Sequence, residues 1–207
     1  MTIDVALGLA ALLSYLLGSI SFAIVVSRLR GLADPRSYGS NNPGATNVLR
    51  SGDKLAAALT LFGDAAKGLA AVLLAAAFAQ QSPAPQQQLL IITAGIAVFV
   101  GHLLPVFFRF QGGKGVATAF GVLLGFDPTI GLLVGLIWLS VVKLSRISSL
   151  AALCAAVAAP ALTFWRHGAE AMLWAVIVIA VLLIARHQRN IIQLLTGKEK
   201  AFKKSSE

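Results

Sequence analysis

The chain has 207 residues, of which 57% are hydrophobic and only 12% are charged, and its mean hydropathy is +0.83. A soluble domain carries about 25% charged residues, so the composition excludes both a soluble globular protein and a disordered one. The net charge of +9 does not by itself indicate nucleic-acid binding, because basic residues of membrane proteins mainly report topology. We therefore expect an integral membrane protein with no nucleic-acid partner.

Apolar runs long enough for membrane helices follow one another along the chain, since a span needs about 20 mostly apolar residues. The first run is preceded by Asp4 and followed by Arg28, the reverse of the charge order of a cleaved signal peptide. The run from 115 to 142 is broken by Asp127-Pro128, because proline disfavours helix at the preceding residue. With two helices in that run, the predicted spans are residues 5–27, 54–79, 89–108, 115–126, 128–142, 147–165 and 169–185.

The distribution of basic residues selects this number of spans. With seven, the segments 28–54, 109–114 and 143–146 and the tail from Arg186 lie on one side and hold 15 of the 17 Lys and Arg residues. With one fewer span, the two sides would hold about equal numbers. The positive-inside rule then puts the N-terminus outside and the C-terminus in the cytoplasm. We expect an all-α, polytopic membrane protein, a compact bundle of seven transmembrane helices that forms one domain over residues 1–207.

Three of the cytoplasmic stretches differ from ordinary connectors. The first is residues 39–50, GSNNPGATNVLR, where Gly and Asn tolerate positive φ and let backbone N–H groups converge on an anion. The second is residues 101–118, where Gly-Gly-Lys-Gly stands directly before an apolar run and puts a lysine at a helix N-terminus, which favours phosphate. The third is residues 186–197, RHQRNIIQLLTG, where His187 and Asn190 share a helix face.

None of these three stretches contains Asp or Glu, and this shared absence indicates a site for anions. Amides, cations and a histidine without carboxylates suit phosphates and leave a divalent cation without its preferred ligands. Taken singly, Gly and Asn clusters are typical of turns, and basic residues beside spans are typical of topology signals. Inside the second span, Asp64 and Lys67 lie three residues apart, which favours a structural ion pair over a functional role.

The stretches GSNNPGATN, GHLLPVFFRFQGGKGVAT and RHQRNI, in this order, resemble the bacterial acyl-phosphate:glycerol-3-phosphate acyltransferase family (PlsY) over essentially the whole chain. One departure is Asn41, where the family usually has glycine. Asparagine is the next best residue at positive φ, so we expect the loop shape to survive. The resemblance implies transfer of a fatty acyl group from acyl phosphate to the 1-hydroxyl of glycerol 3-phosphate. The products would be lysophosphatidic acid and phosphate, formed at the cytoplasmic face of the bacterial inner membrane.

The resemblance also implies which residues serve this reaction. It assigns catalysis to Lys114, His187 and Asn190, with no cofactor and no metal. It implies a monomer surrounded by membrane lipid and functionally coupled to the enzyme that makes acyl phosphate. The residues that it assigns to substrate binding are Ser40, Asn42, Gly44, Thr46, Asn47, Arg50, Gly112, Gly113, Gly115, Ser145 and Arg146.

Two alternatives stay open at the level of the sequence. The first concerns the general base, because the His-x4-Asp pair of other glycerolipid acyltransferases is absent. Either His187 or an oxygen of a substrate phosphate takes the proton, and the carboxylate-free motifs favour the phosphate. The second concerns the class of function. An organic-phosphate transporter or exchanger would also need a basic site, but near the bilayer midplane between inverted repeats, and no repeat is visible.

Overall fold

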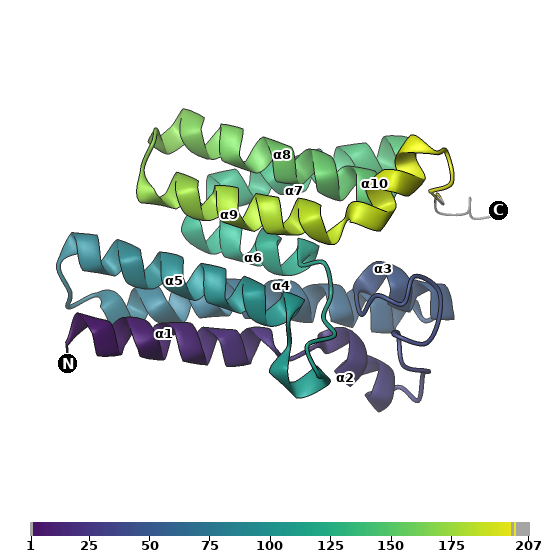
Figure 1. The fold of residues 1–207 in the computed structure, drawn as a ribbon, viewed down its shortest axis with the longest axis horizontal. Helices are drawn as coiled ribbons and strands as arrows, with labels where there is room; N and C mark the ends of the chain where they lie inside the picture. The colour runs from purple at the N-terminus through teal and green to yellow at the C-terminus, as the bar shows by residue number, and fades with distance from the viewer. Residues whose placement is uncertain (1, 200, 202–207) are drawn as a thin grey trace. The chain divides into compact units, whose positions relative to one another are not determined.

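The structure is a computed structural model that describes residues 2–199 and 201. Helices are the regular elements of these residues, which confirms the all-α class (Figure 1). The chain divides into two compact units, Met1–Gly131 (unit 1) and Leu132–Glu207 (unit 2). Each unit is described by itself.

Unit 1 is built from helices that approach one another closely. They are α1 (Ile3–Gly18), α2 (Phe22–Leu29), α3 (Ala45–Val48), α4 (Lys54–Ala79), α5 (Ala84–Leu103) and α6 (Val116–Phe126). Helix α5 packs against α1 and α4, and α6 packs against α4 (Figure 1). A Cβ at Gly18 of α1 would clash with the carbonyl oxygen of Val98, and one at Gly121 of α6 would clash with that of Ala65. Small residues at such contacts are typical of membrane helix packing.

The first expected span, residues 5–27, is not one continuous helix. It divides into α1 and α2 at residues 19–21, although the whole segment Ile3–Leu29 is long and apolar enough to cross a membrane. Lys67 Nζ of α4 donates a hydrogen bond of 2.6 Å to the carbonyl oxygen of Ile20 in the break. The break is tolerated because a residue of another helix satisfies a backbone group that the break exposes.

The second expected span coincides with α4, and the third lies within the segment Ala84–Phe108, which is long and apolar enough to cross a membrane. The Asp53 carboxylate caps α4 by accepting a hydrogen bond of 2.8 Å from the Ala56 amide, and this bond is the main reason that the pKa of Asp53 is lowered. The third span was expected at 89–108, but α5 begins at Ala84 because a proline in its first turn suits a helix start. It ends at Leu103, so the last residues of the expected span lie outside it.

Unit 2 carries the remaining helices. They are α7 (Pro128–Ser145), whose first residues belong to unit 1, α8 (Ser148–His167), α9 (Ala171–Arg186) and α10 (Gln188–Leu195). The expected break before Pro128 is confirmed, and the Asp127 carboxylate accepts a hydrogen bond of 2.7 Å from the Thr129 amide there. Helix α8 packs against α9, and α9 meets α10 at a bend of 62°. Helices α7 to α9 lie within a few residues of the spans expected for them.

The described residues contain five helical segments long and apolar enough to cross a membrane, or six if the bent pair α9 and α10 counts as one span. The fourth expected span, 115–126, corresponds to α6, whose 11 residues rise about 16 Å, roughly half of a bilayer core. The count of seven spans and the orientation therefore stay predictions. Three lysines used in the orientation argument, Lys200, Lys203 and Lys204, lie outside the described residues.

Candidate functional site

The loop at residues 39–50 is shaped from within by Asn47. This residue is 1% exposed, and its Oδ1 accepts a hydrogen bond of 2.9 Å from the Ser40 amide. Its Nδ2 donates bonds of 2.6 and 3.1 Å to the carbonyl oxygens of Pro35 and Tyr38. The side chain of Asn47 thus holds the backbone of residues 35–40, and its expected role in substrate binding stays a prediction.

The backbone of this loop takes the positive φ values that its composition predicts. Asn41 has φ 57°, so asparagine does adopt the conformation expected at the position where the family usually has glycine. Gly39 has φ 61°, and a Cβ there would clash with Oδ1 of Asn47 and meet the side chain of Arg50. The other expected binding residues of the loop are exposed or half-buried: Ser40, Asn42, Gly44 and Thr46.

The Gly-Gly-Lys-Gly turn leads directly into α6, as the sequence predicts. Gly115 precedes the first helical residue with φ 86°. The Gly113 amide donates a hydrogen bond of 3.1 Å to the His102 carbonyl oxygen, and a Cβ at Gly112 would clash with that same oxygen. The turn is therefore packed tightly on the end of α5, with Lys114 half-buried at the start of α6.

The two loops of unit 1 meet at Gly113. A Cβ at this position would clash with the His102 ring and would lie 3.0 Å from the carbonyl oxygen of Pro43. Pro43 belongs to the loop 39–50, so a side chain larger than that of glycine would push the two segments apart. The structure thus brings together the two stretches of unit 1 that the sequence predicts to bind phosphate.

A buried group of charged side chains connects α4 to the glycine turn. Asp64 Oδ1 lies 2.8 Å from Lys67 Nζ, which confirms the expected ion pair. The same oxygen lies 3.5 Å from His102 Nδ1, and all three residues are buried. Buried charges need such partners. Because the His102 ring also lies against Gly113, the group reaches from the interior of α4 to the turn.

His187 of unit 2 stands at the bend between α9 and α10. It is 2% exposed, and its Nδ1 lies 2.8 Å from the carbonyl oxygen of Leu183. A carbonyl oxygen can only accept a hydrogen bond, so Nδ1 carries the proton in this contact. In a neutral ring, Nε2 is then the nitrogen that accepts a proton or a hydrogen bond.

Asn190 and Ser149 of unit 2 share one partner, Glu199. Asn190 Nδ2 donates a hydrogen bond of 2.7 Å to Glu199 Oε1, and the Ser149 hydroxyl donates one of 2.5 Å to the same oxygen. This carboxylate ties the segment after α10 to the first turn of α8. Neither Ser149 nor Glu199 was expected at the site, because the argument from sequence considered carboxylate-free stretches. The available signal was an acid between two lysines in the basic segment after Gly197.

Ser145 and Arg146 form the turn between α7 and α8. The Ser145 hydroxyl donates a hydrogen bond of 2.7 Å to the Val141 carbonyl oxygen and accepts one of 3.1 Å from the Ile147 amide. Ser145 therefore closes the end of α7. Arg146 is exposed and has φ 60°, so it is the cation that this turn presents.

The expected site residues form two sets, one in each unit. Unit 1 holds those of 39–50 and 112–115, and unit 2 holds 145–146, His187 and Asn190. Within residues 2–199 and 201, no group of three or more His, Cys, Asp or Glu side chains is placed to hold a metal ion. Amides, hydroxyls and cations predominate in both sets, and such groups bind phosphate oxygens.

Known proteins resemble this chain over nearly its whole length. The family model described as glycerol-3-phosphate acyltransferase matches residues 8–197. The glycerol-3-phosphate acyltransferase of Burkholderia vietnamiensis is 58% identical over 193 residues, which cover 92% of this chain and 88% of the relative. The Burkholderia multivorans protein of the same name is 57% identical over 193 residues, with the same coverage of both chains.

Solved structures agree with this result. The crystal structure of PlsY (YgiH), an integral membrane glycerol 3-phosphate acyltransferase in its glycerol 3-phosphate form, is 38% identical with a TM-score of 0.87. The match covers 95% of this chain and 96% of that one. The lysophosphatidic acid form gives a TM-score of 0.85 at 38% identity and 95% coverage of both chains. The chain belongs to the glycerol-3-phosphate acyltransferase family.

Proposed function

We propose that this protein transfers a fatty acyl group from acyl phosphate to the 1-hydroxyl of glycerol 3-phosphate, giving lysophosphatidic acid and inorganic phosphate. The observation that carries the proposal is the contact at Gly113, where the Gly-Gly-Lys-Gly turn meets the loop 39–50. The names of the relatives support the acceptor, and the two PlsY structures, in glycerol 3-phosphate and lysophosphatidic acid forms, support the acceptor and the product.

Acyl phosphate as the donor is argued from the chemistry of the loops. Both substrates then carry a phosphate group, which matches two adjoining segments of amides, small hydroxyls and cations. Acyl phosphate is already activated, so the reaction needs neither ATP nor coenzyme A. With this donor, the reaction would need only groups that bind phosphate and no separate site for ATP or coenzyme A.

In unit 1 the loop 39–50 would hold the acyl-phosphate group, with side-chain donors from Ser40, Asn42 and Thr46 and the backbone around Gly44. Asn47 would keep this loop in shape through the three hydrogen bonds of its side chain. Lys114 would neutralise phosphate charge. Its neighbours Gly112, Gly113 and Gly115 would let the turn pack closely enough to position the lysine.

In unit 2, the set of expected residues would serve glycerol 3-phosphate. Arg50 of unit 1 stays a predicted substrate-binding residue. The exposed Arg146 would attract the phosphate, while Ser145 closes the turn that presents this cation. His187 would accept a hydrogen bond from the substrate at Nε2, because Nδ1 is used on Leu183. Asn190 would orient this pocket through its bond to Glu199.

The chemical step needs no group beyond these. The 1-hydroxyl oxygen attacks the acyl carbonyl carbon, a bond forms between them, and the bond from that carbon to the phosphate oxygen breaks. The hydroxyl proton moves to a phosphate oxygen of a substrate, so that the protein positions both reactants and neutralises charge without a metal. His187 as the base is the alternative mechanism, and its imidazole has the geometry to accept a proton.

The setting follows from the same proposal. The chain would act as a monomer and a single acyltransferase domain in the bacterial inner membrane, with its N-terminus outside and its C-terminus and active site on the cytoplasmic side. An enzyme that makes acyl phosphate would supply the donor.

The decisive experiment uses the purified protein in phosphatidylcholine vesicles. Acyl phosphate and glycerol 3-phosphate should together give equal amounts of inorganic phosphate and lysophosphatidic acid, and acyl-coenzyme A should not replace acyl phosphate. Phosphate release that does not depend on glycerol 3-phosphate would contradict acyl transfer. Uptake of labelled glycerol 3-phosphate into the vesicles without any acyl donor would instead support a transporter.

A further inference from the structure

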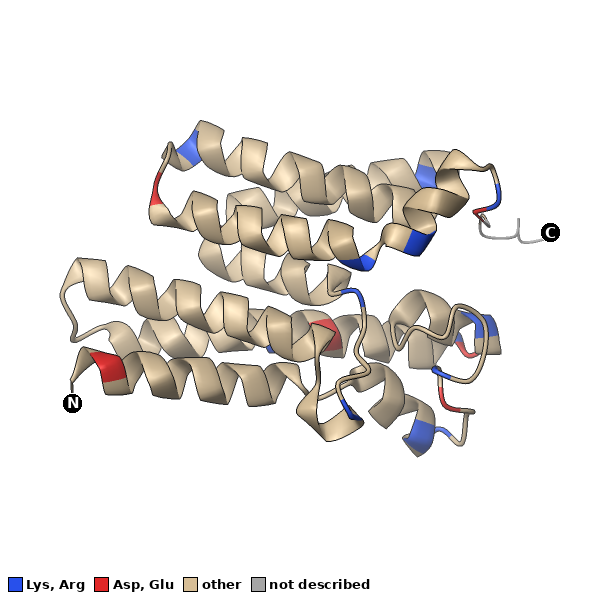
Figure 2. Ribbon diagram, viewed as in Figure 1, with Lys and Arg blue, Asp and Glu red and all other residues tan. Residues whose placement is uncertain are grey.

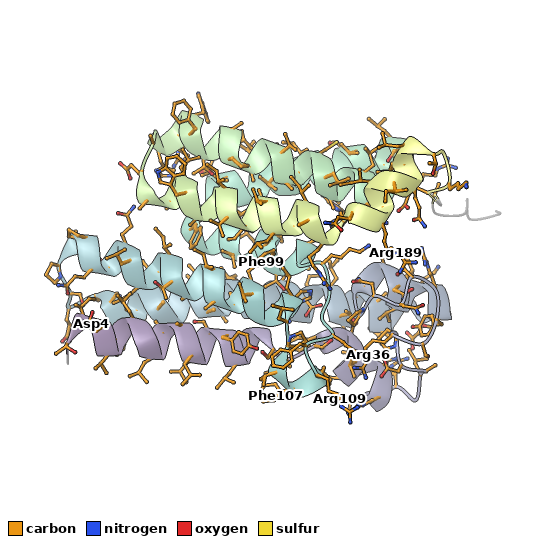
Figure 3. The ribbon with its side chains drawn as sticks, in the orientation of Figure 1. Asp4, Arg36, Phe99, Phe107, Arg109 and Arg189 are labelled. Atoms are coloured by element: carbon orange, nitrogen blue, oxygen red, sulfur yellow. The ribbon has the colours of Figure 1, made fainter. Side chains whose placement is uncertain are left out.

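A cavity of about 480 Å³ in unit 1 is not used by the proposed acyl transfer. It lies where residues 28–37 meet residues 107–111, the segments that directly precede the two loops of the candidate site. Figure 3 shows three of its residues, Arg36, Phe107 and Arg109, at the same end of unit 1. Its lining combines cations with aromatic rings and includes Arg28, Asp34, Arg36, Phe107, Phe108 and Arg109.

The cavity has an excess of positive charge. Arg36 is paired with Asp34, at 2.7 Å between Nη2 and Oδ2 and 3.0 Å between Nε and Oδ1. These hydrogen bonds hold the pKa of Asp34 below its usual value, so the carboxylate is ionised and neutralises Arg36. In the part of the chain that the structure describes, no carboxylate forms a salt bridge with Arg28 or Arg109. With three guanidinium groups and one carboxylate in its lining, the cavity is net positive and suits an anion.

The local structure restrains both of these arginines. The guanidinium carbon of Arg28 lies 6.0 Å from the centroid of the Phe108 ring, the outer range of a cation–π contact. Arg109 and Phe110 have φ values of 54° and 59°, and two successive left-handed residues other than glycine are uncommon. The segment is thus bent so that a cation and aromatic rings are presented together.

The cavity lies at the ends of two segments that can cross a membrane, Ile3–Leu29 and Ala84–Phe108. Phe107 in its lining and the nearby Phe110 are each 58% exposed. In Figure 2, most Lys and Arg residues of unit 1 lie toward this end, around α2 and α3. Exposed aromatic rings beside cations at helix ends are typical of the membrane–water interface.

We propose that this cavity binds the phosphate group of an anionic membrane phospholipid. Arg28 and Arg109 would bind the phosphate oxygens through their N–H donors, because guanidinium groups match phosphate geometry. Phe107 and Phe110 would contact the glycerol and the upper acyl chains. Basic pockets beside membrane helices bind anionic headgroups in this way. A soluble phosphate would use the arginines alone and would leave the exposed rings without a role.

The test is to measure lipid binding to the purified full-length protein in detergent by native mass spectrometry. The probes are phosphatidylglycerol and phosphatidylcholine with identical acyl chains, and the variants are Arg28→Gln/Arg109→Gln and the matched control Lys54→Gln/Arg166→Gln. The unmodified protein should bind phosphatidylglycerol about 10-fold more tightly than phosphatidylcholine. The first variant should lose this preference and the control, which removes the same charge elsewhere, should keep it. An equal loss in both variants would overturn the proposal.

A second arm distinguishes a lipid from a free anion. An excess of inorganic phosphate, matched in ionic strength with chloride, should leave phosphatidylglycerol bound to the unmodified protein. Displacement by phosphate alone would overturn the lipid proposal and indicate a site for a soluble phosphate. A headgroup-photoreactive phosphatidylglycerol should also label residues 28–37 and 107–111 of the unmodified protein, which keeps the test valid if the double variant does not fold. Labelling confined to other segments would contradict it.

Discussion

Asn47 in unit 1 and Glu199 in unit 2 both hold expected site residues, but with different chemistry. Asn47, which is 1% exposed, makes three neutral hydrogen bonds to the backbone at Pro35, Tyr38 and Ser40. Glu199 uses one charged oxygen to hold the side chains of Asn190 and Ser149. A neutral support leaves the positive potential of a phosphate site intact, whereas a carboxylate lowers the potential and fixes geometry more strongly. We infer that unit 1 mainly holds anionic charge and that unit 2 mainly orients a substrate.

The largest effect should come from removing charge in unit 1. Lys114→Ala should lower turnover by about 10²–10³-fold or more, since a positioned donor is lost where phosphate charge accumulates. Steady-state phosphate release in vesicles measures this loss, and thermal unfolding in detergent shows whether the bundle stays folded. Lys54→Ala, an exposed lysine at the start of α4, is the control. Near-normal turnover of Lys114→Ala would show that unit 1 does not hold the reacting phosphate.

The next effect separates loop shape from loop charge. Asn47→Ala removes three hydrogen bonds without changing charge, and should lower turnover by about 10²-fold because the loop amides lose their positions. Asn41→Gly in the same loop keeps the left-handed backbone and should stay near the unmodified activity. For both variants, the rate is measured as a function of the acyl-phosphate concentration. Equal activity of the two variants would mean that Asn47 does not hold the loop.

A smaller effect is expected at Glu199. Glu199→Ala removes the acceptor of two hydrogen bonds and should lower kcat/KM for glycerol 3-phosphate by about 10-fold. Glu199→Gln keeps an oxygen that can accept from Asn190 and Ser149, so it should restore most of the loss. The two variants are compared by rates at low glycerol 3-phosphate. If Glu199→Gln were as impaired as Glu199→Ala, the charge and not the acceptor would be what unit 2 needs.

A variant of His187 distinguishes a residue that only orients glycerol 3-phosphate from one that also accepts its proton. If it orients the substrate, His187→Asn should weaken apparent affinity for glycerol 3-phosphate by about 10-fold and change the maximal rate little. The measurement is the full dependence of rate on glycerol 3-phosphate at saturating acyl phosphate. A fall of about 10²–10⁴-fold in maximal rate at unchanged half-saturation would make His187 the general base.

The smallest effect should come from chelation. Neither set of site residues presents a cluster of carboxylates, and Glu199 alone cannot supply the ligands that a divalent cation prefers. Treatment with EDTA should therefore leave the rate unchanged in the phosphate-release assay, with added Mg²⁺ as the control. A strict requirement restored by Mg²⁺ would contradict the metal-independent mechanism.

Local sequence signals were sufficient to predict the structure of a segment wherever that structure depends on the segment's own residues. Asp127-Pro128 ends one helix and begins the next because proline acts on its neighbour, and Asn41 takes positive φ because its own backbone tolerates it. The long apolar runs likewise predict helices by their composition. The break after Gly18 is not apparent from the sequence, because Lys67, which donates a hydrogen bond to the carbonyl oxygen of Ile20 in the break, belongs to another helix.

The sequence by itself determined the helical membrane class, the family resemblance and the glycine-rich, cationic composition of the loops, since composition and contiguous motifs carry these properties. The tertiary structure decided what each polar side chain does. Asn47 makes hydrogen bonds to the backbone around its own loop, His102 links Asp64 to Gly113, and Glu199 holds Asn190. A hydrogen bond depends on distance and direction in space, and residues that are far apart along the chain give no sign of which partner they will meet.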